Sequence, residues 1–296
     1  MTSSSADRST IDIGHAVLSY RKIGSGPNLL FVHGWPLHGA TWRNVVSRLD
    51  GFTRYVIDLP GFGESVATAD TALDVRAHAD TVVSVIDSLG LDQVVLVGQD
   101  SGGMVCRFAA EQRPDSVKAL VLAGTEIPGV HAPLVRLFQL LARMPGAKAM
   151  FKLNMSNRFL ARTPLILGGT VYDKSLLDGE FRTEVLDPLL QSPHAMQSMV
   201  RMIREFSLDD IDALAEVHPK LTMPTLLMFG EDDRFFPVDK ARPMAEQFGG
   251  PTEFHAFTKC KLFLHEEHPE RFAELTRGFM QRHCGYSKSG SAHQGK

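Results

Sequence analysis

Residues 94–103 read VVLVGQDSGG, and this stretch decides the fold. Its first four residues are apolar and mostly β-branched, which is typical of a central strand in a parallel sheet covered by helices on both faces. Small residues follow at once, and a helical pattern over 104–112 comes directly after them. Glycines in this stretch permit a sharp turn and a close approach of the helix to the strand. The sequence therefore predicts a strand, a tight turn and a helix, with Asp100 at the apex of the turn.

The glycine spacing places Asp100, and not its neighbour, at that apex. The register Gly98-x-Asp100-x-Gly102 keeps a glycine on each side of the apex. A register with Ser101 at the apex would put Gln99 where the first glycine belongs. Ser101 is therefore the residue after the apex, with its backbone N–H directed at the same point. The alternative is an ordinary strand-to-helix turn without a chemical role.

Composition excludes several classes of protein. The chain has 296 residues, 44% of them hydrophobic and 22% charged, which is ordinary for a globular protein. A net charge of −3 provides no basic surface for nucleic acid or an anionic membrane. Residues 1–10 are polar, and no apolar run is long enough to span a bilayer. We therefore expect a cytoplasmic protein with no nucleic acid partner and no membrane partner.

The cysteines and the glycines point to neither a metal nor a nucleotide cofactor. Cys106, Cys260 and Cys284 are odd in number, far apart and without metal-ligand spacing, so we expect reduced thiols. The glycine pair at 61 and 63 lacks the third glycine and the helix of a dinucleotide-binding turn. We expect no metal site and no cofactor.

Strands and helices alternate along most of the chain, which predicts a mostly parallel sheet with right-handed crossovers. The expected strands are an antiparallel pair within 11–23, then 28–32, 55–57, 94–97, 117–122, 225–229 and 252–257. The expected helices between them are 41–49, 73–89, 104–112 and, at the end, 270–282.

The alternation stops between residues 127 and 217, where helical patterns dominate. The expected helices there are 133–143, 176–190, 195–206 and 208–217. We interpret 127–217 as a helical cap over the carboxyl ends of the strands, where ligands bind in such sheets. The alternative is a second domain unrelated to any site. Residues 1–126 and 218–284 then form one α/β core, and the polar segments 2–9 and 285–296 are predicted to be disordered.

Five motifs together resemble the capped α/β-hydrolases, and the resemblance covers nearly the whole chain. The motifs are HGWP at 33–36, DLPGFGES at 58–65, GQDSGG at 98–103, GEDDRFFP at 230–237 and EEHP at 266–269. An aspartate at the apex narrows the resemblance to epoxide hydrolases and hydrolytic dehalogenases. The resemblance implies an α/β-hydrolase fold: a mostly parallel sheet flanked by helices, with a helical cap inserted after the sixth strand.

The same resemblance assigns roles to individual residues. Asp100 would attack an electrophilic carbon and form an alkyl-enzyme ester, which a histidine-activated water then hydrolyses. The backbone N–H groups of Trp35 and Ser101 would form the oxyanion hole. Asp233 stands at the position of the acid that orients the histidine, and Glu126 stands at the alternative acid position that some dehalogenases use.

The histidine is missing from the expected position. Counting back from the EEHP segment, the place of the base is taken by Leu262, which can neither accept a proton nor orient water. His265 and His268 follow at the start of the last helix, where we expect them to face solvent. The resemblance therefore implies a nucleophile and an acid without the base between them.

The substrate-binding residues separate this chain from the dehalogenases that the resemblance includes. Haloalkane dehalogenases carry Trp, and fluoroacetate dehalogenases Arg, where this chain has Ser101. We expect His33 and Tyr172 to contact the substrate, with Tyr172, the one tyrosine in the predicted cap, as a proton donor to an epoxide oxygen. Apolar cap residues favour a small apolar substrate, although such residues also form ordinary cap cores.

Two functions follow from this sequence. The first is an epoxide hydrolase-like hydrolase that attacks an apolar epoxide or alkyl halide through Asp100. The second is an α/β-hydrolase-fold protein that has lost hydrolysis. Such a protein would catalyse a rearrangement, an elimination or a cyclisation, or would bind a small apolar ligand.

Overall fold

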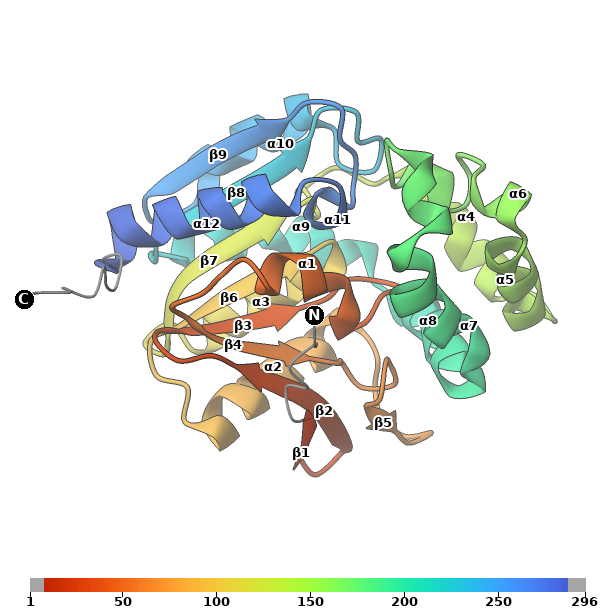
Figure 1. Cartoon of the computed structure of the whole chain (residues 1–296), viewed down its shortest axis with the longest axis horizontal. Helices are drawn as coiled ribbons and strands as arrows, with labels where there is room; N and C mark the ends of the chain where they lie inside the picture. The colour runs from red at the N-terminus through yellow and green to blue at the C-terminus, as the bar shows by residue number, and fades with distance from the viewer. Residues whose placement is uncertain (1–7, 287–296) are drawn as a thin grey trace, which may run out of the picture.

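The computed structural model describes residues 8–286, which form a nine-stranded sheet with helices on both faces (Figure 1). The strands are β1 (Arg8–Asp12), β2 (Ala16–Ile23), β3 (Asn28–Val32), β4 (Thr53–Ile57), β5 (Val66–Ala67), β6 (Val94–Gln99), β7 (Val117–Ala123), β8 (Thr225–Gly230) and β9 (Thr252–Phe257). Their order across the sheet is β1-β2-β4-β3-β6-β7-β8-β9, and the two-residue β5 pairs with β2. β2 is antiparallel to each of its neighbours β1, β4 and β5, whereas β4, β3, β6, β7, β8 and β9 are parallel. The sequence predicted both the antiparallel pair and the mostly parallel sheet.

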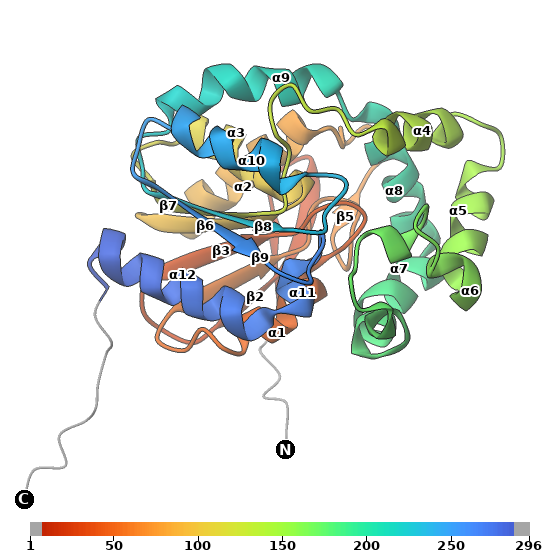
Figure 2. The same cartoon turned by 90° about the horizontal axis from the view of Figure 1, so that it is seen from above.

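The central strands are buried on both faces, which explains why β6 is a continuous apolar run. Val94 and Leu96 belong to one hydrophobic cluster, and Val95 and Val97 belong to a second cluster on the opposite face. The first face is covered by α2 (Val75–Leu89), α3 (Ser101–Gln112), α9 (Leu208–Val217) and α10 (Val238–Met244). The second is covered by α1 (Arg43–Val46), α11 (Leu264–Glu267) and α12 (Pro269–Cys284), as Figure 2 shows. The predicted helix at 41–49 is a 3₁₀ turn over Gly39–Trp42 followed by the short α1.

A group of helices inserted after β7 lies beside the sheet, at the end where the loop after β3 meets α8 (Figures 1 and 2). These cap helices are α4 (Pro133–Ala142), α5 (Ala147–Ser156), α6 (Arg158–Ala161), α7 (Asp187–Gln191) and α8 (Pro193–Glu205). Because β5 stands off the main path, β7 is the sixth strand of that path. α9, which the sequence grouped with the cap, packs instead against α3 on the core.

The predicted helix at 176–190 is broken into three pieces. A 3₁₀ turn spans Lys174–Asp178, a π-helical turn spans Arg182–Leu186, and α7 follows. The chain leaves the helical conformation at Gly179 (φ −96°, ψ −148°), which separates the 3₁₀ turn from the two later pieces. Pro188 lacks an N–H and so removes one regular helical hydrogen bond near the start of α7. Further 3₁₀ turns occur at Leu167–Gly169, His218–Lys220 and Ala245–Gln247.

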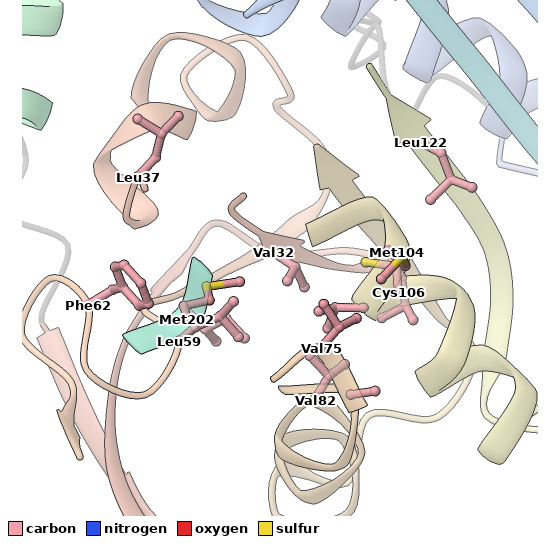
Figure 3. Close-up of a cluster of buried hydrophobic side chains, with 14 of the residues drawn as sticks. Val32, Leu37, Leu59, Phe62, Val75, Val82, Met104, Cys106, Leu122 and Met202 are labelled. Carbon is pink, nitrogen blue, oxygen red and sulfur yellow. The ribbon is translucent and has the colours of Figure 1, made fainter. Parts of the chain in front are cut away.

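The core continues from the sheet into the cap without a break. Figure 3 shows Met202, from α8, beside Leu59 and Phe62 of the loop that follows β4. The rest of this cluster lies under β3, β6 and α3 and includes Met104 and Cys106. Large apolar side chains therefore hold the cap against the core, and the cap and the sheet share one hydrophobic cluster.

The ends of the described chain are ordered further than the sequence suggested. Arg8 and Ser9, predicted to be disordered, belong to β1. Of the predicted tail, Gly285 ends α12, and Tyr286 packs on Phe52 with ring centroids 6.1 Å apart. The rest of both predicted segments lies outside the described residues. The three cysteines form no disulfide, and no helix within residues 8–286 is long and apolar enough to cross a bilayer.

Candidate active site

Asp100 occupies the tight turn between β6 and α3, as the glycine spacing predicted. Its backbone has φ 53° and ψ −137°, a conformation that costs a non-glycine residue about 1–3 kcal/mol. The turn is held from both sides, because the Asp100 N–H donates to the carbonyl of Gly124 (2.9 Å) and its carbonyl accepts from Gly103 (2.8 Å). A Cβ on Gly102 would lie 2.5 Å from the carbonyl oxygen of His33, so only glycine lets α3 approach β3 this closely.

The predicted oxyanion donors, the backbone N–H groups of Trp35 and Ser101, both bond the Asp100 carboxylate. The backbone N–H of Trp35 donates to Oδ2 at 3.0 Å, and the Ser101 hydroxyl lies 3.3 Å from the same oxygen. The Ser101 backbone N–H also bonds this carboxylate. A Cβ on Gly34 would lie 2.5 Å from the Asp100 Cβ, which explains the glycine in the HGWP motif. None of the described side chains donates to Oδ1, so this oxygen is free to attack a carbon atom.

A cavity lined mainly by apolar side chains lies directly over Asp100, between the core and the cap. Trp35 and Leu262 line it from the core side. The cap contributes aromatic and aliphatic side chains, among them Val135, Phe138, Phe151, Met155, Ile203 and Phe206. Its polar side chains among the described residues are the carboxyl groups of Asp100 and Glu126 and the hydroxyls of Ser101 and Thr170. Such a site favours a small apolar molecule that carries one reactive polar centre.

Glu126 and a buried arginine support the cavity from below. Glu126 is 3% exposed, and its Oε2 accepts from the Thr125 hydroxyl at 2.8 Å. Arg107, fully buried on α3, donates to the Thr125 hydroxyl and to the Glu126 carbonyl, and lies 3.7 Å from Glu126 Oε2. Burial raises the pKa of Glu126, and the Arg107 charge partly offsets the effect. Burial, together with the charge of Glu126, raises the pKa of Asp100 as well.

Asp233 is buried at the end of β8 and has an unused acceptor. Its Oδ1 accepts the backbone N–H of Phe235 at 2.8 Å, whereas Oδ2 has no partner among residues 8–286. Burial raises the pKa of this carboxyl to about 7. Asp233 is not among the residues that line the cavity. The carboxyl therefore lies behind the cavity wall with half of its hydrogen-bonding capacity unfilled.

Leu262 lies in the loop between β9 and α11 and lines the cavity together with Asp100. Its carbonyl accepts from the side chain of Gln99, at 3.4 Å. A Cβ on Gly124 would lie 3.2 Å from Leu262 Cδ1, so the leucine side chain packs over the end of β7. The residue at the predicted position of the base is thus near the nucleophile, but it has no group that can accept a proton.

Comparison with known proteins agrees with this geometry. The family model of the alpha/beta hydrolase fold matches residues 27–269. This chain belongs to the alpha/beta hydrolase fold family.

Two curated relatives are similar over most of their length. A 2-hydroxy-6-oxononadienedioate/2-hydroxy-6-oxononatrienedioate hydrolase from a Pseudomonas species is 29% identical, over 88% of this chain and 86% of the relative. A pimeloyl-[acyl-carrier protein] methyl ester esterase from Vibrio vulnificus is 28% identical, over 84% of this chain and 96% of the relative. One relative is named as a hydrolase and the other as an esterase, and the reactions in their names differ from each other.

Solved structures with similar folds include an epoxide hydrolase and a haloalkane dehalogenase. The epoxide hydrolase CorEH has a TM-score of 0.79 and 24% identity, and the match covers 93% of this chain and 99% of that one. The haloalkane dehalogenase DbeA from Bradyrhizobium elkani has a TM-score of 0.77 and 21% identity, and the match covers 95% and 99% of the two chains. At these identities the similarity establishes the fold.

None of the described residues that line the cavity of this α/β-hydrolase is a histidine. His265, predicted to face solvent, is instead fully buried in α11, where its ring packs at a tilt against Trp42 and lies 2.7 Å from the Thr41 hydroxyl. Burial lowers the pKa of His265 to about 3, so it is a neutral core residue at physiological pH. His268 is half-buried at the start of α12, where its ring lies near the Lys259 carbonyl. The prediction that both residues face solvent was therefore wrong for His265.

The two residues expected to contact substrate lie elsewhere. Tyr172 is 46% exposed and does not line the cavity. Its backbone N–H donates a hydrogen bond to the Glu267 carboxylate. His33 is 1% exposed, and its ring Nε2 accepts the backbone N–H of Leu59 at 2.9 Å. Burial lowers the pKa of His33 to about 4, and the neutral ring ties β3 to the loop after β4. The structure thus gives His33 a supporting position and leaves Tyr172 on the surface.

Sequence reasoning missed Thr125, Thr170 and Arg107. Thr170 lines the cavity, Thr125 bridges Glu126 and the Asp100 carbonyl, and Arg107 donates to Thr125. The sequence carries a signal for only one of them. A charged residue in an otherwise apolar α3 indicates a buried partner, because an isolated buried charge is costly.

Proposed function

We propose that this α/β-hydrolase uses Asp100 to open an apolar epoxide or alkyl halide and form an alkyl-enzyme ester. The observation that carries the proposal is the position of the Asp100 carboxylate. Its Oδ2 is held by the Trp35 and Ser101 donors while the carboxylate lines an apolar cavity. An oriented, partly desolvated carboxylate is a suitable nucleophile for a carbon electrophile.

The reaction has two halves, and the site is equipped for the first. In the first half, Oδ1 forms a bond to carbon, and the carbon–oxygen or carbon–halogen bond breaks with its electron pair on the leaving atom. In the second half, water must attack the ester carbonyl, whose oxygen is then Oδ2 in the hole formed by Trp35 and Ser101.

The second half lacks its base. General-base activation of water contributes about 10²–10⁴-fold to such a step, and Leu262 cannot supply it. We therefore expect the ester to form faster than it breaks down. An enzyme with this balance accumulates its covalent intermediate, which makes the first half directly observable.

A second candidate function rests on the same leucine. An apolar residue at the position of the base favours exclusion of water, and an intermediate that water does not reach can rearrange, eliminate or cyclise. A protein of this kind would bind the same apolar molecule and release an isomer of it. The alternative requires that no solvent oxygen enters the product.

Intact-protein mass spectrometry tests the proposal. The protein is incubated with 1,2-epoxyhexane or with 1-bromohexane, which share a chain length and differ in the leaving atom. We expect an adduct of the whole epoxide, or of the hexyl group less one hydrogen, on the peptide that contains Asp100. In Asp100→Asn the adduct rate should fall by at least about 10³-fold, because the nucleophile is gone.

The outcomes separate the two functions. An adduct with slow release of diol or alcohol supports the ester mechanism. An isomer of the epoxide without adduct, and without oxygen-18 from labelled water, supports the second candidate. An adduct that forms equally fast in Asp100→Asn shows that another residue reacts, and the proposal is then wrong.

A further inference from the structure

The cavity holds a second ionisable side chain that the first half of the reaction leaves without a role. When an epoxide opens, its oxygen leaves as an alkoxide and needs a proton, which in an apolar cavity must come from a neighbouring acid. Tyr172, the expected donor, is on the surface. Apart from Asp100 itself, Glu126 is the one carboxyl among the described residues that line the cavity.

Glu126 is held in place while one of its oxygens stays free. It follows the end of β7, next to β6, so its backbone is fixed by the same sheet that fixes Asp100. Its Oε2 bonds the Thr125 hydroxyl at 2.8 Å, and the same hydroxyl lies 2.9 Å from the Asp100 carbonyl. The backbone N–H of Glu126 also bonds this carboxylate, and no side chain among residues 8–286 donates to Oε1, the oxygen that we assign to carry the proton.

The carboxyl groups of Asp100 and Glu126 are electrostatically coupled. Both are buried in a mainly apolar region, and the charge of Glu126 opposes ionisation of Asp100. Two adjacent carboxyl groups in such surroundings titrate as a pair, with one charged and one protonated over a wide pH range. The Trp35 and Ser101 donors favour the charge on Asp100, whereas Arg107 favours it on Glu126. The reactive form has the charge on Asp100 and the proton on Glu126.

We propose that Glu126 is the general acid that protonates the leaving oxygen, which makes epoxides the preferred substrate class of this site. This inference rests on the proposed function of Asp100. As Oδ1 of Asp100 bonds to carbon, the carbon–oxygen bond breaks and its electron pair stays on the oxygen. That oxygen takes the proton from Glu126, which leaves a 2-hydroxyalkyl ester on Asp100 and a carboxylate on Glu126. A proton from solvent then restores Glu126.

The cavity is less suited to a halide. A departing halide needs N–H donors, and the indole N–H of Trp35 is already donated to the Met199 carbonyl at 2.9 Å. A halide needs no proton, however, so an alkyl bromide tests the attack by Asp100 independently of Glu126.

The matched pair of substrates therefore separates the two roles. In Glu126→Gln the rate of adduct formation from 1,2-epoxyhexane should fall by about 10²–10⁴-fold, because the amide has no acidic proton. The rate from 1-bromohexane in the same variant should not fall, because general-acid help contributes only to the epoxide reaction and loss of the Glu126 charge favours the ionised form of Asp100. Glu126→Asp keeps a carboxyl and should recover part of the epoxide rate.

Three results would overturn the inference. An unchanged epoxide rate in Glu126→Gln shows that the proton comes from elsewhere. An equal loss with both substrates shows that Glu126 only positions Asp100 or supports the fold, and a thermal unfolding curve of the variant then identifies which. Absence of any adduct in the wild type removes the proposed function of Asp100 itself, and the role of Glu126 falls with it.

Discussion

Asp100 and Asp233 are both buried carboxyl groups at the carboxyl ends of strands in one sheet, yet their surroundings differ. Asp100 has donors to Oδ2 and faces the cavity. Oδ1 of Asp233 accepts one hydrogen bond, whereas Oδ2 has no partner among the described residues, and the side chain does not line the cavity. In the proposed mechanism, the groups for attack on carbon meet at Asp100, whereas Asp233, the proposed acid for activating water, has no histidine to orient among the described residues that line the cavity. The comparison shows that the two halves are built independently.

The reason lies in how each half is assembled. The attacking half comes from one continuous strand, turn and helix, with Trp35 supplied by the neighbouring β3. The water-activating half depends on a side chain at 262 in a loop that no strand pairing holds. In the proposed mechanism, leucine at 262 leaves this half without a base, and the side-chain hydrogen bonds of Asp100 come from Trp35 and Ser101 and do not involve residue 262.

The largest expected effect comes from supplying the missing base. Leu262→His puts an imidazole on the cavity wall, near the free Oδ2 of Asp233. We expect breakdown of the Asp100 ester to accelerate by about 10²–10⁴-fold, the usual contribution of a general base. Stopped incubations that follow the loss of the hexyl adduct by mass would measure this rate.

Leu262→Gln serves as the matched control, because it adds a polar group without a base. A gain of the same size in Leu262→Gln would mean that entry of water into the cavity, and not base catalysis, limits breakdown of the ester in the wild type. In the double variant Leu262→His, Asp233→Asn, most of the gain should disappear if Asp233 orients the new histidine. If the gain disappears instead in the double variant Leu262→His, Glu126→Gln, Glu126 is the orienting acid.

A smaller effect is expected on stability. The pKa of Asp233 rises from 3.8 to about 7 on folding, so the folded state holds a proton that the unfolded state releases. Stability from this group is therefore full below pH 4 and is lost as pH rises toward 7, by roughly 4 kcal/mol at most. Lys261 and Glu267 are the charged groups that face it, and they act in opposite directions.

Asp233→Asn should remove this pH dependence. Urea unfolding at pH 5 and at pH 8 would measure the free energy of unfolding for both proteins. We expect the wild type to lose more stability than the variant between the two pH values. Equal losses would show that Asp233 ionises normally, and the contrast with Asp100 would then rest on geometry alone.

The smallest effect is expected at Tyr172. Its side chain is 46% exposed and its backbone, not its hydroxyl, contacts Glu267. Tyr172→Phe should change the epoxide adduct rate by less than about twofold, since surface substitutions away from a site have small effects. A fall as large as that expected for Glu126→Gln would identify Tyr172 as the proton donor. Its side chain would then have to reach the cavity in a cap arrangement different from the one in this structure.

Local sequence patterns predicted the strand, turn and helix that carry Asp100. The turn at Asp100 is set by the glycines beside it, and the central strand by the apolar run before it. Both signals are local, so the sequence predicted the turn and the central strands. The break in the helix at 176–190 was missed because apolar spacing outweighed the effect of Pro188 in that interpretation.

Contacts between distant segments were the part that the sequence left open. His265 is buried because Thr41 and Trp42, far away in the chain, surround it, and no periodicity in the last helix indicates this. Tyr172 faces outward for a similar reason, since the loop that carries it is positioned by Glu267. Roles that depend on a third element require the assembled structure.

Trp35 makes two bonds that point in opposite directions. Its amide holds the Asp100 carboxylate, and its indole holds the Met199 carbonyl on α8 of the cap. Trp35 therefore connects α8 of the cap directly to the Asp100 carboxylate. If α8 moves to admit a substrate, we expect the same residue to transmit that motion to the carboxylate.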